Sequence, residues 1–152
     1  MKKKILFVCH GNVGRSPSAE YLFKDMVYHA GLANRFEISS AGTAHEAVGI
    51  PFDARAKQRL LDHGIKCEEH FARLMTQEDF DENDMIICMD DFNVGEIYRL
   101  FGDVSKVSKL LDYTDHAGVE IADPWITKDF DTAWGEIKAG CAGLLEYVKE
   151  QL

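Results

Sequence analysis

Cysteines are few in the 152-residue sequence, and the four present, Cys9, Cys67, Cys88 and Cys141, include no Cys-x-x-Cys spacing. Such a set does not predict a metal site or a dense disulfide framework, and scattered thiols of this kind are usually reduced in cytosolic proteins. Basic residues are also a minority, because 17 Lys and Arg stand against 26 Asp and Glu, for a formal net charge of −9. An acidic chain has no general affinity for nucleic acid, so we expect no nucleic-acid partner.

Long apolar runs are missing as well, and no stretch approaches the length of a membrane span. Three lysines precede the apolar run from Ile5 to Val8, but this run is too short for the hydrophobic region of a signal peptide. We therefore expect a cytoplasmic protein. Its 46% of hydrophobic residues suffices for one core, so residues 1–152 are predicted to form a single domain, and we expect a monomer.

Short apolar runs alternate with helical patterns along the chain. Pro17 to Ala30 has apolar residues at helical spacing, with Ser16 as the expected N-cap. A loop covering 111–128 is unusually long, which favours a functional role. The alternation predicts an α/β fold with a doubly wound, four-stranded parallel sheet and helices on both faces. Strands are expected at 3–8, 36–40, 85–89 and 106–110, and helices at 17–30, 53–63, 91–101 and 130–148, with a further short helix that begins at a capping box of Thr76 and Asp79.

The first predicted strand ends at Cys9, and the sequence from Cys9 to Arg15 has the spacing C-x5-R. A strand, a glycine-containing loop and a helix start form the usual layout of an anion site. The same N–H donors stabilise a thiolate, Ser16 can donate a hydrogen bond to that sulfur, and Arg15 can bind two phosphoryl oxygens at once. Asn12 is expected in a left-handed conformation. The residues predicted to bind phosphate are His10, Gly11, Asn12, Val13, Gly14, Arg15 and Ser16.

Taken alone, Cys9 would be interpreted as a small buried residue and Arg15 as an ordinary surface charge. Their combination with two glycines and a hydroxyl, after a strand and before a helix, favours catalysis instead. In a doubly wound sheet the carboxyl ends of the strands form the ligand site, and Cys9 lies at such an end.

The segment VCHGNVGRSPSAE, Val8 to Glu20, closely resembles the phosphate-binding loop of low-molecular-weight protein tyrosine phosphatases, whose usual pattern is V-C-x-G-N-x-C-R-S-P. The resemblance implies a four-stranded parallel sheet and hydrolysis of phosphotyrosine or small aryl phosphates through a phosphocysteine, without a metal or other cofactor. Inorganic phosphate would be the product and an inhibitor. The likeness continues in SSAGT (39–43), DHGI (62–65), HFARLMTQEDF (70–80), ICMDDFN (87–93) and IADPW (121–125).

The resemblance also implies that Cys9 is the nucleophile, that Arg15 binds the phosphoryl group and that Asp123 is the general acid. Physical chemistry gives a similar mechanism, in which the thiolate attacks phosphorus while Asp123 protonates the leaving oxygen and later activates water. An Asp-Pro pair alone would indicate only a turn. Its place in the long loop 111–128 favours a catalytic role.

Four further residues are expected around this site by resemblance. Ser40 and His70 match family positions that hydrogen-bond around the loop asparagine, here Asn12, although a lone histidine is as well explained by packing. Trp125 would be a wall for an aromatic ring at the rim of the substrate pocket. Glu46 stands near a rim position that is often aromatic in the family.

Two departures from the family pattern leave alternatives open. Gly14 replaces the usual second loop cysteine, and Trp125-Ile126 replaces the usual tyrosine pair. An arsenate reductase on the same fold would need closely spaced resolving cysteines, and a phosphoryl carrier would lack the loop arginine and the acid. A third alternative is a phosphate-binding module without catalysis, but nucleophile, arginine and acid are all in place.

Overall fold

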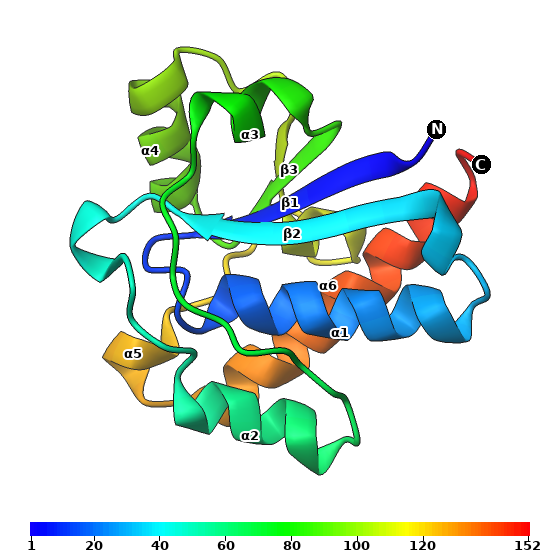
Figure 1. Cartoon of the computed structure of the whole chain (residues 1–152), viewed down its shortest axis with the longest axis horizontal. Coiled ribbons are helices and arrows are strands. Elements are labelled where there is room, and N and C mark those ends of the chain that lie inside the picture. Colours follow the sequence, from blue (N-terminus) through cyan, green and yellow to red (C-terminus); the bar gives the residue numbers. More distant parts are fainter.

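The computed structural model describes residues 1–152 and contains one parallel sheet with the strand order β2-β1-β3-β4. The central strand β1 pairs Cys9 with Gly42 of β2 and Val8 with Cys88 of β3. The carboxyl ends of these strands therefore meet at one edge of the sheet (Figure 1), which confirms the predicted fold class. The strands are β1 (Lys3–Cys9), β2 (Phe36–Gly42), β3 (Met85–Cys88) and β4 (Val107–Lys109).

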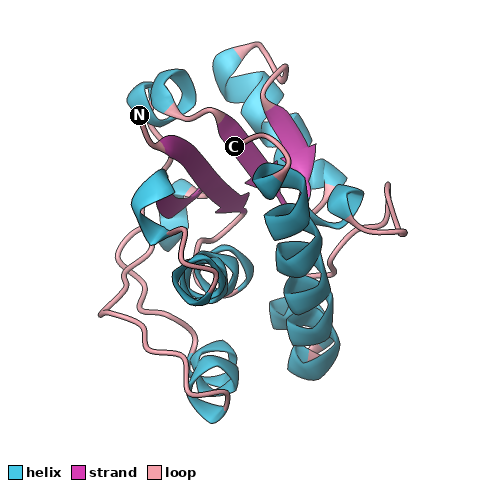
Figure 2. Cartoon of the chain, turned by 90° about the vertical axis from the view of Figure 1, so that its right-hand side faces the viewer, coloured by secondary structure: helices cyan, strands magenta, loops and turns pink.

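Helices cover both faces of the sheet. In Figure 1, α1, α2 and α6 lie on one side of the strands and α3 and α4 on the other, and Figure 2 shows the same layers from the side. The helices are α1 (Arg15–His29), α2 (Ala54–Asp62), α3 (Gln77–Glu82), α4 (Asp91–Phe101), α5 (Pro124–Thr127) and α6 (Phe130–Lys149), with 3₁₀ turns η1 (Ala33–Arg35), η2 (His45–Ala47) and η3 (Leu110–Tyr113). None of these helices has the length and apolar composition needed to cross a membrane.

The side chains of β1 divide the core into two layers, because successive residues of a strand point to opposite faces. Ile5 and Phe7 belong to the larger cluster, which includes the buried faces of α1 and α6, whereas Leu6 and Val8 pack with residues of α3 and α4. All four are fully buried. Burial of each stabilises the fold by about 1.5–3 kcal/mol, so the strand that ends in Cys9 is firmly fixed.

The start of α1 differs from the prediction. The helix begins at Arg15 after Gly14, and no side chain caps it, so the expectation that Ser16 is the N-cap was wrong. Ser16 lies inside the first turn and its hydroxyl contacts Cys9 instead. The physical reason is that the first N–H groups of this helix remain available for an anion, a place that a side-chain cap would occupy.

The segment 111–128 is also more ordered than the predicted long loop. It contains the end of η3 and the short helix α5. Asp123 caps α5 by accepting a hydrogen bond from the backbone N–H of Trp125 at 3.0 Å, and Pro124 occupies the first helical position, which its fixed φ favours. The Asp-Pro pair thus starts a helix and fixes Asp123 at its N-terminus.

Candidate active site

The segment Cys9–Arg15, called the phosphate loop below, connects β1 to α1, and hydrogen-bond donors from this loop and from the first turn of α1 lie around the Cys9 sulfur. The backbone N–H of Asn12 donates to Cys9 Sγ at 3.2 Å. Ser16 Oγ lies 3.0 Å from the same sulfur. Because Ser16 Oγ already accepts a hydrogen bond from Asn12 Nδ2 at 2.9 Å, its hydrogen is free to point at the sulfur. Two donors of this kind stabilise a thiolate.

Asn12 holds the loop in shape. Its φ of 56° is left-handed, as the sequence predicted, and its side chain is fully buried. Nδ2 also donates to Ser40 Oγ at 3.0 Å, and Oδ1 accepts from the backbone N–H of Arg73 at 3.0 Å. The Asn12 carbonyl lies 2.9 Å from His70 Nε2. Ser40 and His70 therefore contact Asn12, in the arrangement that the resemblance implied.

Two residues that support this network were missed by the sequence analysis. Glu20 of α1 accepts a hydrogen bond from Ser40 Oγ at 2.6 Å. Arg73 donates to the Ser40 carbonyl at 3.0 Å in addition to its contact with Asn12. No local pattern marks either residue, because both contacts join segments that are distant in sequence.

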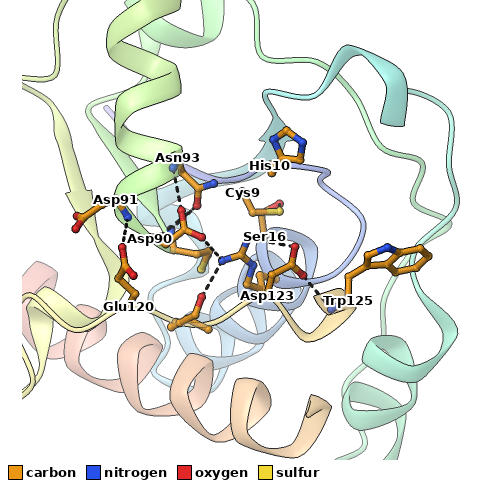
Figure 3. Close-up of polar contacts among 12 residues, drawn as sticks. Cys9, His10, Ser16, Asp90, Asp91, Asn93, Glu120, Asp123 and Trp125 are labelled. Atoms are coloured by element: carbon orange, nitrogen blue, oxygen red, sulfur yellow. Dashed lines mark hydrogen bonds and ion pairs between the residues drawn. The ribbon is translucent and has the colours of Figure 1, made fainter. Parts of the chain in front are cut away.

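The Arg15 guanidinium is nearly buried and is held from behind the loop. Nη1 donates to Asp90 Oδ2 and to the Ile121 carbonyl, both at 2.7 Å, and Nη2 lies 3.7 Å from Asp123 Oδ2 (Figure 3). Burial alone lowers the pKa of Arg15, but the Cys9 sulfur, Asp90 and Asp123 outweigh burial and raise it. No hydrogen bond within the protein uses Nε or Nη2, so these donors can take two oxygens of one phosphoryl group.

Asp90 explains how Arg15 is aimed. It caps a helix and also reaches the site. One carboxylate oxygen accepts from the backbone N–H of Asn93 at the start of α4, and the other accepts from Arg15. The helix cap fixes the carboxylate, and the carboxylate fixes the guanidinium.

Gly42, the last residue of β2, is required by the close approach of the phosphate loop. A Cβ at this position would lie 2.9 Å from the His10 carbonyl oxygen and 3.0 Å from Asn12 Cβ. Backbone N–H groups of Thr43 and Ala44 bind the same carbonyl at 2.9 and 2.8 Å. The phosphate loop therefore packs directly against the end of β2 and is hydrogen-bonded to the residues that follow it.

A cavity of about 240 Å³ opens above the phosphate loop. Asn12, Ser16, Ser40 and His70 do not line it, because their side chains bind the loop from behind. The predicted residues that do line it are Cys9, His10, Gly11, Val13, Gly14, Arg15, Glu46, Asp123 and Trp125, and the unpredicted ones are Ala44, Ala47, Ile50, Asp53, Pro124 and Phe130. A sulfur and an arginine at the base with apolar walls suit a phosphate ester of an aromatic alcohol.

The His10 side chain extends from the loop toward α4 (Figure 3). Its Nδ1 lies 3.0 Å from Glu96 Oε1, and its ring lies against Phe92, with the ring centroids 5.5 Å apart. The sequence analysis placed His10 only among the phosphate-binding residues and missed Glu96, which is 86 positions away.

Comparison with known proteins gives a consistent result. A sequence model of the family described as low molecular weight phosphotyrosine protein phosphatase matches residues 4–152. The Bacillus subtilis low molecular weight protein-tyrosine-phosphatase YfkJ is 33% identical over 150 residues, covering 97% of this chain and 96% of the relative. The human low molecular weight phosphotyrosine protein phosphatase is 34% identical over 150 residues, covering 95% of this chain and 94% of the relative.

Solved structures agree with the sequence matches. The crystal structure of YfkJ aligns with a TM-score of 0.95 and 32% identity over 99% of this chain and 97% of that chain. A crystal structure described as Drosophila arginine phosphatase aligns with a TM-score of 0.85 and 31% identity over 98% of each chain. These likenesses extend over the whole fold and include the phosphate loop.

Proposed function

The chain belongs to the low molecular weight phosphotyrosine protein phosphatase family, and we propose that it hydrolyses phosphotyrosine with Cys9 as nucleophile, Arg15 as phosphate-binding residue and Asp123 as general acid. The observation that carries this assignment is the position of the Cys9 sulfur, which accepts from the Asn12 N–H at 3.2 Å at the base of the cavity. Arg15 and Asp123 line the same cavity, so the three groups can act on one bound phosphate.

The first step transfers the phosphoryl group to sulfur. The Cys9 thiolate attacks phosphorus in line, a sulfur–phosphorus bond forms, and the bond from phosphorus to the phenolic oxygen breaks. Asp123 gives its proton to the departing oxygen, so that the product leaves as a neutral phenol. Arg15 and the loop N–H groups neutralise the equatorial oxygens during transfer, which is the role metal ions have in other phosphoryl-transfer sites.

The second step restores the enzyme. A water molecule attacks phosphorus from the side vacated by the phenol, and Asp123, now a carboxylate, accepts the proton of that water. The sulfur–phosphorus bond breaks, inorganic phosphate is released and the thiolate returns. Inorganic phosphate fits the same donors as the substrate, so it acts as a competitive inhibitor as well as the product.

The shape of the cavity supports tyrosine over serine as the substrate side chain. Ile50, Trp125 and Phe130 are among its walls, and aromatic and aliphatic walls favour a flat ring. The substrates are therefore phosphotyrosine in a protein and small aryl phosphates. We further propose that residues 1–152 act as a single domain and a monomer in the cytoplasm.

The buried cysteines argue against arsenate reduction, the nearest alternative. Cys88 and Cys141 are fully buried, and burial raises the pKa of both thiols. Thiols held in the protonated form exchange slowly with an oxidised partner. A non-hydrolytic phosphoryl carrier is equally unsupported, because Arg15 and Asp123 both line the cavity with Cys9.

A comparison of substrates tests this function. The value of kcat/KM should be highest for a phosphotyrosine peptide, well above the values for matched phosphoserine and phosphoarginine peptides, and it should be unchanged by a chelator. Cys9→Ser should abolish turnover, since the groups bonded to the side chain at position 9, the Asn12 N–H and the Ser16 hydroxyl, include no base that could ionise a serine hydroxyl. Equal efficiency on the three peptides, a higher value for phosphoarginine, or an active Cys9→Ser variant would overturn the proposal.

A further inference from the structure

The charges at the mouth of the cavity are unevenly paired. Glu46, Asp53 and Asp123 line the cavity beside one arginine, Arg15. Asp53 caps α2 and forms an ion pair with Arg55 at 3.0 Å, and Asp123 caps α5 and faces Arg15. Glu46 has neither partner: no backbone N–H and no lysine or arginine lies within bonding distance of its carboxylate. Its side chain is 79% exposed.

The only polar contact of Glu46 is with His10, whose Nε2 lies 3.7 Å from Oε1. That imidazole is already shared, because His10 Nδ1 lies 3.0 Å from the buried carboxylate of Glu96. Glu96 also accepts a hydrogen bond from Thr43 Oγ1 at 2.5 Å and lies 3.6 Å from Arg99. This side of the mouth therefore has two carboxylates around one imidazole, and the exposed carboxylate is the one without a cation.

The opposite sign of charge is found around Trp125. Arg55 lies 5.7 Å and Lys128 lies 5.4 Å from the Trp125 ring centroid, both within cation–π range. In the view of Figure 3, His10 lies above Cys9 and Trp125 lies to its right, beyond Asp123. The rim is thus asymmetric, with the unpaired negative charge beside His10 and cations beside Trp125.

A phosphotyrosine dianion that enters beside Glu46 meets a like charge, in a chain whose formal net charge is −9. A cation carried by the substrate next to the phosphotyrosine would pair with Glu46 and offset this repulsion. The exposed apolar side chain of Ile50, which lines the same cavity as Glu46, gives the methylene stem of such a residue a surface to pack on.

We propose that Glu46 is a specificity-determining residue that selects phosphotyrosine peptides carrying a lysine or arginine next to the phosphotyrosine. The inference rests on the phosphotyrosine phosphatase function proposed above. It names Glu46 as the partner of the substrate cation and leaves the chemistry at Cys9 unchanged.

Three peptides test it, identical except for Lys, Gln or Glu next to the phosphotyrosine. For the wild type, kcat/KM with Lys should exceed that with Gln by about two- to fivefold, the range expected of an exposed ion pair, and higher salt should reduce the ratio. Glu46→Gln should bring the ratio close to one, and Glu46→Lys should favour the Glu peptide. Glu82→Gln is the matched control, because Glu82 is exposed at the end of α3 and outside the cavity, and its ratio should equal that of the wild type.

Two results would overturn the inference. One is a wild-type enzyme that hydrolyses the three peptides equally. The other is a lysine preference that does not depend on Glu46 in particular, either because it persists in Glu46→Gln or because Glu82→Gln reduces it as much as Glu46→Gln does. The preference would then come from the net charge of the protein. A wild type that hydrolyses none of the peptides and no aryl phosphate would overturn the proposed function as well, so the two failures are distinguishable.

Discussion

Replacing Asn12 with alanine should destabilise the protein strongly, because this one side chain bonds to three separate segments. Nδ2 donates to Ser16 and Ser40, and Oδ1 accepts from the backbone N–H of Arg73, at distances of 2.9, 3.0 and 3.0 Å. Alanine removes all three bonds and leaves the partners unsatisfied in a site that water does not reach.

The magnitude follows from the geometry of Asn12. Three buried hydrogen bonds contribute about 1 kcal/mol each to the free energy of unfolding, and the φ of 56° costs alanine about 1 kcal/mol or more. The expected loss is therefore about 4 kcal/mol, a large part of the roughly 5–15 kcal/mol of a typical domain. At about 2–4 °C per kcal/mol for a chain of this size, Tm should fall by roughly 8–16 °C.

Asn12→Gly is the matched control. It removes the same hydrogen bonds but tolerates the left-handed conformation, while its greater freedom in the unfolded chain costs about 0.4–1 kcal/mol. We expect Asn12→Gly to be more stable than Asn12→Ala by about 0.5 kcal/mol in urea titrations, with kcat/KM reduced in both. An alanine variant within about 1 kcal/mol of the wild type, or a glycine variant less stable than alanine, would refute this reasoning.

Three further changes test other parts of the account. Asp123→Ala should reduce kcat by about 10²–10⁴ on phenolic leaving groups and by much less on groups that leave without a proton, whereas an equal loss across the series would mark Asp123 as structural. Burial alone raises the pKa of Asp79, but hydrogen bonds from Arg73 and the backbone lower it on balance. The ionised Asp79 therefore stabilises the fold above its unfolded pKa, and this stability is lost as pH falls below about 4. Acid titration should destabilise the wild type more than Asp79→Asn, and the same loss of stability in both proteins would contradict this. Peroxide inactivation of Cys9 should be poorly reversed by a thiol reductant, because Gly14 offers no sulfur that could form a disulfide with the oxidised Cys9. Gly14→Cys should restore recovery, and a Cβ at this position meets no atom within 4 Å. Full recovery of the wild type through an intrachain disulfide would disprove this explanation.

Local signals in the sequence were sufficient for most of the fold. Asp53 caps α2, and Thr76 with Asp79 forms a capping box at α3, because a cap depends only on residues three or four positions apart. The strand ending at Cys9 and the left-handed Asn12 were predicted for the same reason. Each depends on the chemistry of its own neighbours.

Long-range contacts were beyond such signals. Ser16 satisfies the local rule for an N-cap, but the sulfur of Cys9 and the amide of Asn12 take its hydroxyl. The pairing of His10 with Glu96 depends on how β1 and α4 meet at the sheet edge. Residues that position the site through tertiary contacts carry no periodicity or motif of their own, and only the fold brings them together.

The central claim is that catalysis passes through a phosphoryl group on Cys9. The most direct measurement uses Asp123→Ala, in which the attack of water on the phosphocysteine is slowed. The variant is mixed rapidly with an aryl phosphate whose phenolate leaves without a proton, quenched within the first turnover and examined by mass spectrometry. We expect one phosphoryl group on the peptide that contains Cys9, and none when Cys9→Ser is added to the variant. A phosphoryl group on another residue, or release of the phenol in that first turnover with Cys9 unmodified, would contradict it.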